Sequence, residues 1–274
     1  MRFGYDGAGF YGWADQPGRR TVEGELIAAL TEHRQFRREA PDRIAVASRT
    51  DRGVSARGNA LLLRSSLGGP ALLRALNGLA PDIFFTHARE VGPGFRPRHA
   101  IGRTYRYLEP AAGHDLAQWR TWADGFVGTF DVRSFGRGLA ADRPVRRTLE
   151  RLSITPDGPW FVIELAGPGF VWGMVRKLVG AFRAVEAGDI SEDQLAAARR
   201  GTRRLAVPLA EAEGLILWEV HYPAPWEVES PGWNRHQERY WESTRWTAAR
   251  RQEVVSRLTG SRVPTTYLSG DVSP

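Results

Sequence analysis

The predicted secondary structure repeats one order of elements twice, and this order restricts the fold more than any other feature of the sequence. In residues 1–100, alternating apolar residues predict strands, and apolar residues at helical spacing predict helices. Their order is strand, helix, strand, strand, helix, strand, which is the ferredoxin-like or split βαβ arrangement. The expected strands cover 2–6, 43–48, 59–64 and 83–90, and the expected helices cover about 22–34 and the segment from Pro70 to Pro81.

Residues 101–222 show the same order again. The expected strands cover 103–109, 147–155, 160–166 and 215–222, and the expected helices cover 115–126, 172–186 and, as a short additional element, 191–200. The chain therefore predicts an α+β fold of two similar halves with a central cleft between them.

Residues 223–274 differ in composition from both halves. Trp226, Trp233, Trp241 and Trp246 stand among Pro, Arg and Glu residues, and the segment 236–258 fits one helix. The interpretation that we favour is a C-terminal extension that packs its aromatic side chains onto the body of the protein. The other interpretation is an additional surface on which RNA bases stack.

The chain is strongly basic, and its cations are almost all arginine. Lys and Arg together number 38 against 31 Asp and Glu, which gives a net charge of +7. A basic surface suggests a polyanionic partner, and the planar guanidinium group both pairs with phosphate and stacks on bases. An arginine-rich codon preference explains the ratio of Arg to Lys equally well, but the net positive charge remains under either explanation.

Several cofactor sites are excluded by the residues that the chain has and lacks. Cysteine is absent, and the six histidines are scattered without an H-x-x-x-H pair, so no metal is expected. Gly7–Gly12 matches G-x-G-x-x-G, but residues 15–18 separate it from the next helix, which argues against dinucleotide binding. The single lysine, Lys177, does not follow the glycines of a P-loop. We expect no cofactor, no membrane span and, because no secretion signal is recognisable, a cytoplasmic protein.

The segment Ser48–Gly58 is the strongest candidate for chemistry. It is predicted as a loop between two apolar strands, and it places one carboxylate, Asp51, among Arg49, Arg52 and Arg57. Nearby guanidinium groups favour the ionised form of a carboxylate, which then serves as a nucleophile or base toward an anomeric carbon or a polarised ring. The other interpretation is an Asx turn with a surface ion pair, and residue chemistry alone favours it.

Arg49-Thr50-Asp51, Gly53-Val54 and Ala56 resemble the R-T-D-x-G-V-x-A signature of the tRNA pseudouridine synthase A family. The resemblance extends over residues 3–222, because further segments match motifs of this family in the same order: Tyr5–Trp13, Thr21–Leu26, Ala75–Asn77, Pro81–Ile83, Phe95–Arg98, Arg103–Tyr107, Gly167–Gly180 and Glu213–Leu217. It implies a pseudouridine-synthase fold, with residues 1–100 carrying the aspartate loop, residues 101–222 forming the second half and residues 223–274 as an extension.

The resemblance also implies roles for single residues. Asp51 would attack the target nucleoside, and Tyr105 would lie against the uracil and help to remove the proton from C5. Arg176 would pair with Asp51 from the second half, while Arg49, Arg52 and Arg57 would bind the RNA substrate. Tyr105 has an alternative interpretation as cross-strand packing beside Tyr107. Arg176 has an alternative as a solvated helix position, although its apolar surroundings favour a buried cation that needs an anion.

The implied activity is the isomerisation of uridine to pseudouridine in the anticodon stem-loop of tRNA, at positions 38 to 40 in tRNA numbering. Such an enzyme transfers uracil from an N1 to a C5 glycosidic linkage without a cofactor, and the family acts as a homodimer. The sequence leaves open whether Asp51 attacks C1′, attacks C6 or removes a proton at C2′. The alternative function is a non-catalytic RNA-binding protein on the same scaffold.

Overall fold

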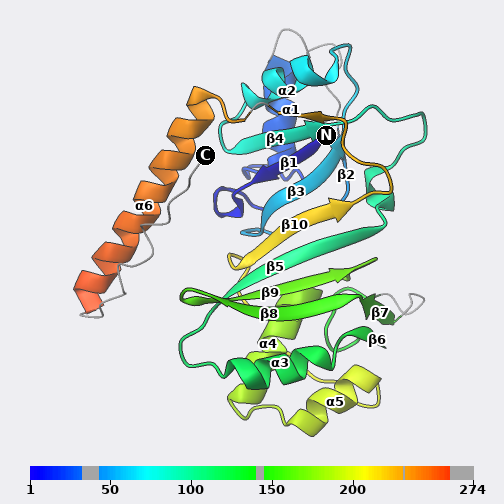
Figure 1. Cartoon of the computed structure of the whole chain (residues 1–274), viewed down its shortest axis with the longest axis vertical. Helices are drawn as coiled ribbons and strands as arrows, with labels where there is room; N and C mark the ends of the chain where they lie inside the picture. The colour runs from blue at the N-terminus through cyan, green and yellow to red at the C-terminus, as the bar shows by residue number, and fades with distance from the viewer. Residues whose placement is uncertain (33–42, 140–144, 231, 260–274) are drawn as a thin grey trace.

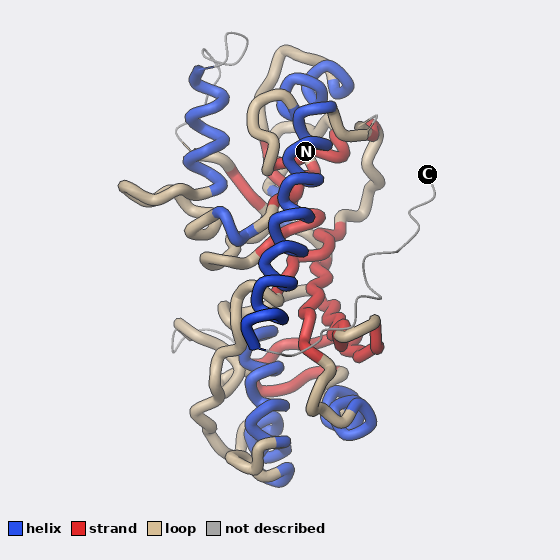
Figure 2. The backbone as a smooth tube through the Cα atoms, turned by 90° about the vertical axis from the view of Figure 1, so that its left-hand side faces the viewer, coloured by secondary structure: helices blue, strands red, loops and turns tan. Residues whose placement is uncertain are grey.

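The chain folds around one large mixed β-sheet (Figure 1). The computed structural model describes residues 1–32, 43–139, 145–230 and 232–259. In Figure 1, helices α1 (Val22–Glu32) and α4 (Met174–Glu186) lie behind the sheet, and Figure 2 shows both on one side of it from the edge. The long helix α6 (Arg235–Thr259) runs alongside the body.

Strand pairing follows the same pattern in each half of the sheet. In the first half the order is β4-β1-β3-β2, and every neighbouring pair is antiparallel. In the second half the order is β10-β5-β9-β8, again antiparallel throughout. The strands are β1 (Arg2–Tyr5), β2 (Ala45–Val46), β3 (Ser55–Leu62), β4 (Ile83–Ala88), β5 (Gly102–Pro110), β8 (Arg151–Asp157), β9 (Trp160–Gly167) and β10 (Leu215–His221).

One short parallel pairing joins the two halves into a continuous sheet. Ile216 and Leu217 of β10 stand opposite Ser55 and Ala56 of β3. Because Ser55 begins β3, this seam lies directly after the loop that carries Asp51.

Each half has its own hydrophobic core on the helix-covered face of the sheet. In the first, α1 and α2 (Gly69–Asn77) pack on β1, β3 and β4 through Leu26, Leu73 and Phe3. In the second, α4 and α3 (Leu116–Asp124) pack on β5, β8 and β9 through Phe182 and Trp119. Tyr105 on β5 packs against both cores.

Three expected strands differ from the structure. The strand expected over 59–64 is β3, which begins at Ser55, so the last four residues of the predicted loop Ser48–Gly58 belong to the strand. Strand 43–48 is reduced to β2, because only Ala45 and Val46 pair with β3 and the segment lies at an edge. Strand 147–155 is interrupted at Glu150, whose backbone N–H donates to the Ala166 carbonyl. Residues before the break form β7 (Arg146–Leu149), which pairs with β6 (Gly128–Asp131) in a separate two-stranded sheet that the sequence did not predict.

Helices α3, α4, α5 (Glu192–Arg200) and α6 begin and end within two residues of their expected positions. Helix α2 ends at Asn77, before the expected Pro81, and the expected end of α1 at residue 34 lies outside the described residues. Helix α5 starts with a capping box at Ser191, and a short strand, β11 (Val228–Glu229), extends the sheet beyond β4. In the C-terminal extension, Trp233 and Trp241 pack near Phe84 of β4, whereas Trp246 is 62% exposed. Among the described helices, α6 included, none has the length and apolar character needed to cross a membrane.

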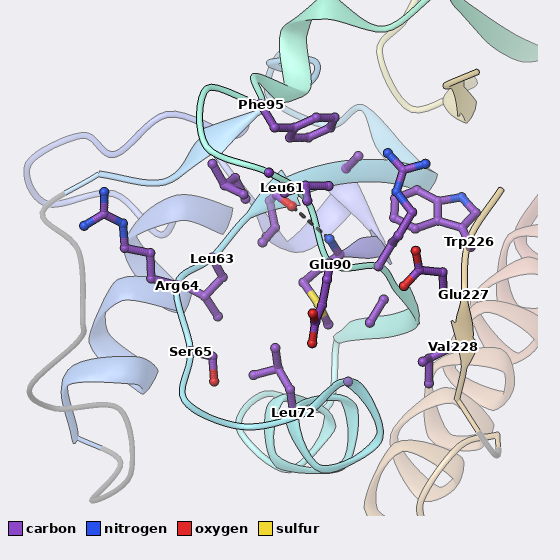
Figure 3. Close-up of a pocket in the computed structure, with 18 of the residues that line it drawn as sticks. Leu61, Leu63, Arg64, Ser65, Leu72, Glu90, Phe95, Trp226, Glu227 and Val228 are labelled. Atoms are coloured by element: carbon purple, nitrogen blue, oxygen red, sulfur yellow. Dashed lines mark hydrogen bonds between the residues drawn. The ribbon is translucent and has the colours of Figure 1, made fainter. Parts of the chain in front are cut away.

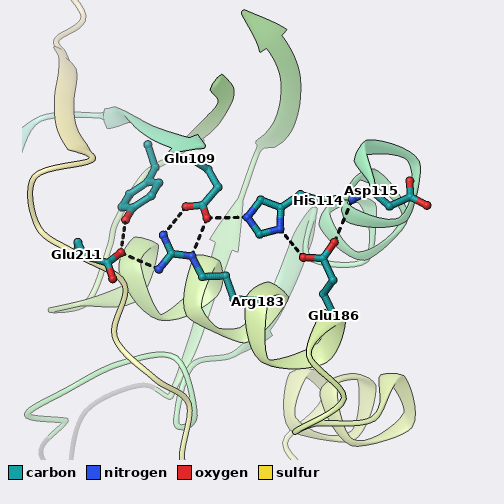
Figure 4. A network of polar contacts seen from close by, with 7 residues as sticks. Glu109, His114, Asp115, Arg183, Glu186 and Glu211 are labelled. Carbon is teal, nitrogen blue, oxygen red and sulfur yellow. Dashed lines mark hydrogen bonds and ion pairs between the residues drawn. The ribbon is translucent and has the colours of Figure 1, made fainter. Parts of the chain in front are cut away.

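A buried polar network fixes α4 to the sheet (Figure 4). Glu109 on β5 is 1% exposed and accepts two hydrogen bonds of 2.7 Å from the Arg183 guanidinium on α4. His114 lies between Glu109 and Glu186, and Glu186 also accepts the Asp115 backbone N–H at 3.0 Å. The network therefore ties β5, α4 and the start of α3 together.

This network predicts an acid-sensitive stability. Burial alone would raise the pKa of Glu186, but the Asp115 backbone N–H and the His114 side chain hold it below its ordinary value of 4.5. A carboxyl group with a lowered pKa in the folded state stabilises the fold above its unfolded pKa, and this stabilisation is lost as the pH falls through the folded pKa. We expect the free energy of unfolding to fall below pH 4.5, and to fall less steeply in Glu186→Gln.

Urea denaturation over a range of acidic and neutral pH values measures this effect. Glu150→Gln, at an exposed position outside the network, is the matched control and should keep the slope of the wild-type protein. Equal slopes for Glu186→Gln and wild type would contradict the assignment of Glu186 to the acid response.

Candidate active site

A cavity of about 530 Å³ lies where the two halves meet. Its lining comes from the loop before β3, from β5, from the loop between β9 and α4, and from the first turn of α4. Four of the six residues that the sequence singled out line it: Arg49, Asp51, Tyr105 and Arg176. A second cavity of about 620 Å³ in the first half is lined by Leu61, Leu72, Glu90 and Trp226 among others, and by none of the six (Figure 3).

The loop that carries Asp51 is held by one backbone and one side-chain contact from the N-terminal segment. The Trp13 backbone N–H donates to the Thr50 carbonyl at 3.1 Å, and the Thr50 hydroxyl hydrogen-bonds to the Tyr5 phenol at 2.8 Å. Gly12 has a φ of +93°, and a Cβ atom there would stand 2.7 Å from the Thr50 carbonyl oxygen. The glycine-rich stretch 7–12 therefore supports the Asp51 loop by close backbone approach.

The Asp51 carboxylate is contacted from two sides. Nη1 of Arg176 lies 3.5 Å from Oδ2, and Nε1–H of Trp172 donates to Oδ1 at 2.8 Å and to Oδ2 at 2.9 Å. The Asp51 side chain is 36% exposed, so the carboxylate also faces the open cavity.

Arg176 reaches Asp51 from the first turn of α4. Its side chain is 14% exposed, and Nε donates to the Ala210 carbonyl oxygen at 2.6 Å. This hydrogen bond fixes the guanidinium plane and leaves Nη1 directed at Asp51. A cation buried to this degree is stabilised by the nearby anion.

Tyr105 forms part of the cavity wall beside Asp51. Its ring meets Phe170 edge to face, with centroids 4.8 Å apart. Burial raises the pKa of Tyr105, and the negative charge of Asp51 raises it further, while Arg103 and Ser48 act in the opposite direction. The phenol is therefore neutral near neutral pH.

The three arginines near Asp51 in the sequence separate in space. Arg49 is exposed and lines both this cavity and an adjacent one that contains Arg96 and Arg98. Arg52 is exposed and lies over the Tyr11 ring, 4.3 Å from its centroid.

Arg57 lies outside the Asp51 cavity. It follows Ala56, whose side chain enters the first core, so strand alternation directs Arg57 to the opposite face of the sheet. There its guanidinium group lies 4.4 Å from the Trp218 ring centroid.

Three residues that the sequence did not single out shape the site. Trp172 contacts Asp51 directly, and Gly12 supports its loop. Arg103 donates to the Ser48 hydroxyl and to the Ala47 and Arg98 carbonyl oxygens, so that it ties β5 to the segment before Asp51. Arg103 and Trp172 both lie inside matched motifs, but nothing in their spacing shows these contacts. Within the described residues, no group of three or more His, Asp or Glu side chains is placed to hold a metal ion.

The support from Gly12 is testable by substitution. Gly12→Ala places a Cβ against the Thr50 carbonyl in a left-handed conformation, so we expect a loss of about 1–3 kcal/mol in the free energy of unfolding. Gly18→Ala is the matched control, because Gly18 has a φ of +69° and a Cβ atom there would meet nothing within 4 Å. Chemical denaturation should show the larger loss for Gly12→Ala, and equal losses would mean that the close approach has no energetic effect.

Comparisons with known proteins agree on one family. A family model described as tRNA pseudouridine synthase matches residues 123–223. The tRNA pseudouridine synthase A of Thermococcus gammatolerans is 38% identical over 228 residues, which cover 81% of this chain and 84% of that protein. The protein of the same name from Methanoculleus marisnigri is 37% identical over 227 residues, covering 82% of this chain and 83% of that protein.

Proposed function

Since the chain belongs to the tRNA pseudouridine synthase A family, we propose that it converts uridine to pseudouridine in the anticodon stem-loop of tRNA, in a reaction that depends on Asp51. The observation that carries the proposal is the cavity in which the Asp51 carboxylate, the Arg176 guanidinium and the Tyr105 ring meet.

The reaction is an isomerisation within one nucleotide. The N1–C1′ bond breaks, the uracil turns, and a C5–C1′ bond forms. The proton on C5 is lost and N1 gains one, so the atoms and charges balance without an oxidant, a reductant or an energy source. The proposed enzyme accordingly needs no cofactor.

Asp51 is the group that acts on the nucleoside. Its carboxylate is partly open to the cavity, and attack on C1′, attack on C6 and proton removal at C2′ all use one of its oxygens. Arg176, held by the Ala210 carbonyl, orients the carboxylate and stabilises its charge. Since a base in a stem is stacked, the target uridine must leave its stack to reach this position.

Tyr105 lies against the uracil in this proposal. Because its raised pKa keeps the phenol protonated, it assists the loss of the C5 proton by hydrogen bonding rather than as a phenolate. The edge-to-face contact with Phe170 holds its ring in place.

The surface around the cavity fits RNA. Arg49, Arg96 and Arg98 line one adjoining cavity, and the whole chain carries a net charge of +7. We propose that Arg49 and Arg52 contact phosphates beside the target nucleotide, and that Arg57 contacts RNA only beyond the cavity. Binding through phosphates weakens steeply with salt.

The strand orders of the two halves support a further part of the proposal. The orders β4-β1-β3-β2 and β10-β5-β9-β8, each antiparallel, are those of two ferredoxin-like units, and their joint cleft is the proposed active site. A homodimer remains an expectation from the family, and a cytoplasmic location remains an expectation from the sequence.

Substitution of Asp51 tests the reaction. Asp51→Asn keeps the size of the side chain and its ability to accept from Trp172, but removes the charge. We expect pseudouridine formation in transcribed tRNA to fall by at least about a thousandfold, the scale of loss when a nucleophile is removed, with tRNA affinity retained. Carbodiimide treatment followed by primer extension maps the product, and filter binding measures affinity.

The control is Asp189→Asn, an exposed aspartate outside the cavity lining, which should modify tRNA like the wild-type protein. Equal activity of Asp51→Asn and wild type would remove Asp51 from its role. If the wild-type protein binds tRNA but forms no pseudouridine in any tRNA, the non-catalytic RNA-binding function would be favoured.

A further inference from the structure

Trp172 makes an unusual contact for an exposed tryptophan. It lies in the loop between β9 and α4, and 54% of its surface is exposed. Its ring is therefore not held by a core, yet its single polar group donates to both oxygens of Asp51 at 2.8 and 2.9 Å. Hydrogen bonds to an ionised acceptor are about twice as strong as neutral ones, so this contact fixes the indole over the carboxylate.

The support of the indole comes from a side chain that is itself exposed. The Arg137 guanidinium lies 4.6 Å from the ring centroid, and the Arg137 backbone N–H donates to the Trp172 carbonyl at 2.9 Å. Gly173, with a φ of +77°, separates Trp172 from the first turn of α4. The indole is thus able to rotate away from Asp51 without disturbing either core or the helix that carries Arg176.

The position of the indole conflicts with catalysis. Every route open to Asp51 requires one of its oxygens within about 3–3.5 Å of the reacting atom. Arg176 and Trp172 both line the cavity, and the indole N–H donates to both Asp51 oxygens. A nucleotide that approaches either oxygen from the side of the indole has to displace the Trp172 N–H.

We propose that Trp172 is a positioning residue that occupies the Asp51 carboxylate in the free enzyme and is displaced by the incoming target nucleotide. In the free enzyme it keeps the carboxylate hydrogen-bonded and directed into the cavity. When the nucleotide enters, the ribose or uracil takes the place of the indole N–H. This inference rests on the proposed function, because it assigns to Asp51 the encounter with the nucleotide.

Displacement makes a specific kinetic prediction for Trp172→Phe. Phenylalanine keeps a ring beside Arg137 but has no N–H, so the nucleotide no longer competes for the carboxylate. We expect KM for tRNA to fall roughly 3- to 10-fold, since water replaces part of the lost hydrogen bond, while kcat changes by less than about twofold because the transition state does not use the indole. Single-turnover and steady-state assays with the same tRNA separate the two constants.

The matched control is Trp160→Phe. Trp160 is 41% exposed at the start of β9 and does not line the Asp51 cavity, so both constants should stay at wild-type values. An unchanged or higher KM in Trp172→Phe would overturn the proposal. A lower kcat with unchanged KM would also overturn it, because it would show that the indole supports the reacting state. Thermal unfolding of each variant checks that folding is intact.

A second measurement reports on the indole without catalysis. In protein labelled with ¹⁵N at the indole nitrogens, the signal missing from Trp172→Phe identifies Trp172. We expect the chemical shift of this signal to differ between wild type and Asp51→Ala. In Asp51→Asn, we expect it to change when saturating tRNA is added. An indole chemical shift that does not change when tRNA is added would overturn the proposed displacement. Retained activity in Asp51→Asn would instead overturn the proposed function, so the two failures are distinguishable.

Discussion

The approach of a carboxylate from one half of the molecule to a guanidinium from the other is the contact on which the site depends. Asp51 lies in the loop before β3, and Arg176 lies on α4, so their 3.5 Å separation requires both a defined seam and a fixed helix. The pairing of β10 with β3 provides the seam. The buried bonds between Arg183 and Glu109 hold α4 on the sheet two turns further along, so stability and site geometry have a common origin.

The sequence predicted those parts of the site that follow from local patterns. Asp51, Tyr105 and Arg176 each lie in a segment that resembles a family motif, their pairing was expected from that resemblance, and the structure brings the three side chains to one cavity. Trp172 and Gly12 were not predictable, because their importance comes from contacts with residues distant in the sequence. Arg57 is close to Asp51 in the sequence, but the alternation of side chains along β3 places it on the opposite face of the sheet. The β6–β7 pair was missed because its strands are short and half exposed.

The arginine content has more than one structural use. Arg2 pairs with Glu219, Arg106 with Glu164, and Arg183 with Glu109, and these cations stabilise the fold. Arg57 and Arg106 both lie over the ring of Trp218, on the face of the sheet opposite α1 and α4. The basic groups available for an anionic partner at the cavity are therefore a smaller set, centred on Arg49, Arg96 and Arg98.

The seam between the halves also has a mechanical consequence. The ladder between β3 and β10 pairs Ile216 with Ser55 and Leu217 with Ala56, whereas β5 and β9 pair along their whole length from Arg103 to Pro110. Bending between the two halves would concentrate at this two-pair ladder, beside the loop of Asp51. Such bending would change the width of the cavity while both cores stay intact. A polyanion bound across the seam would contact both halves and restrict this motion.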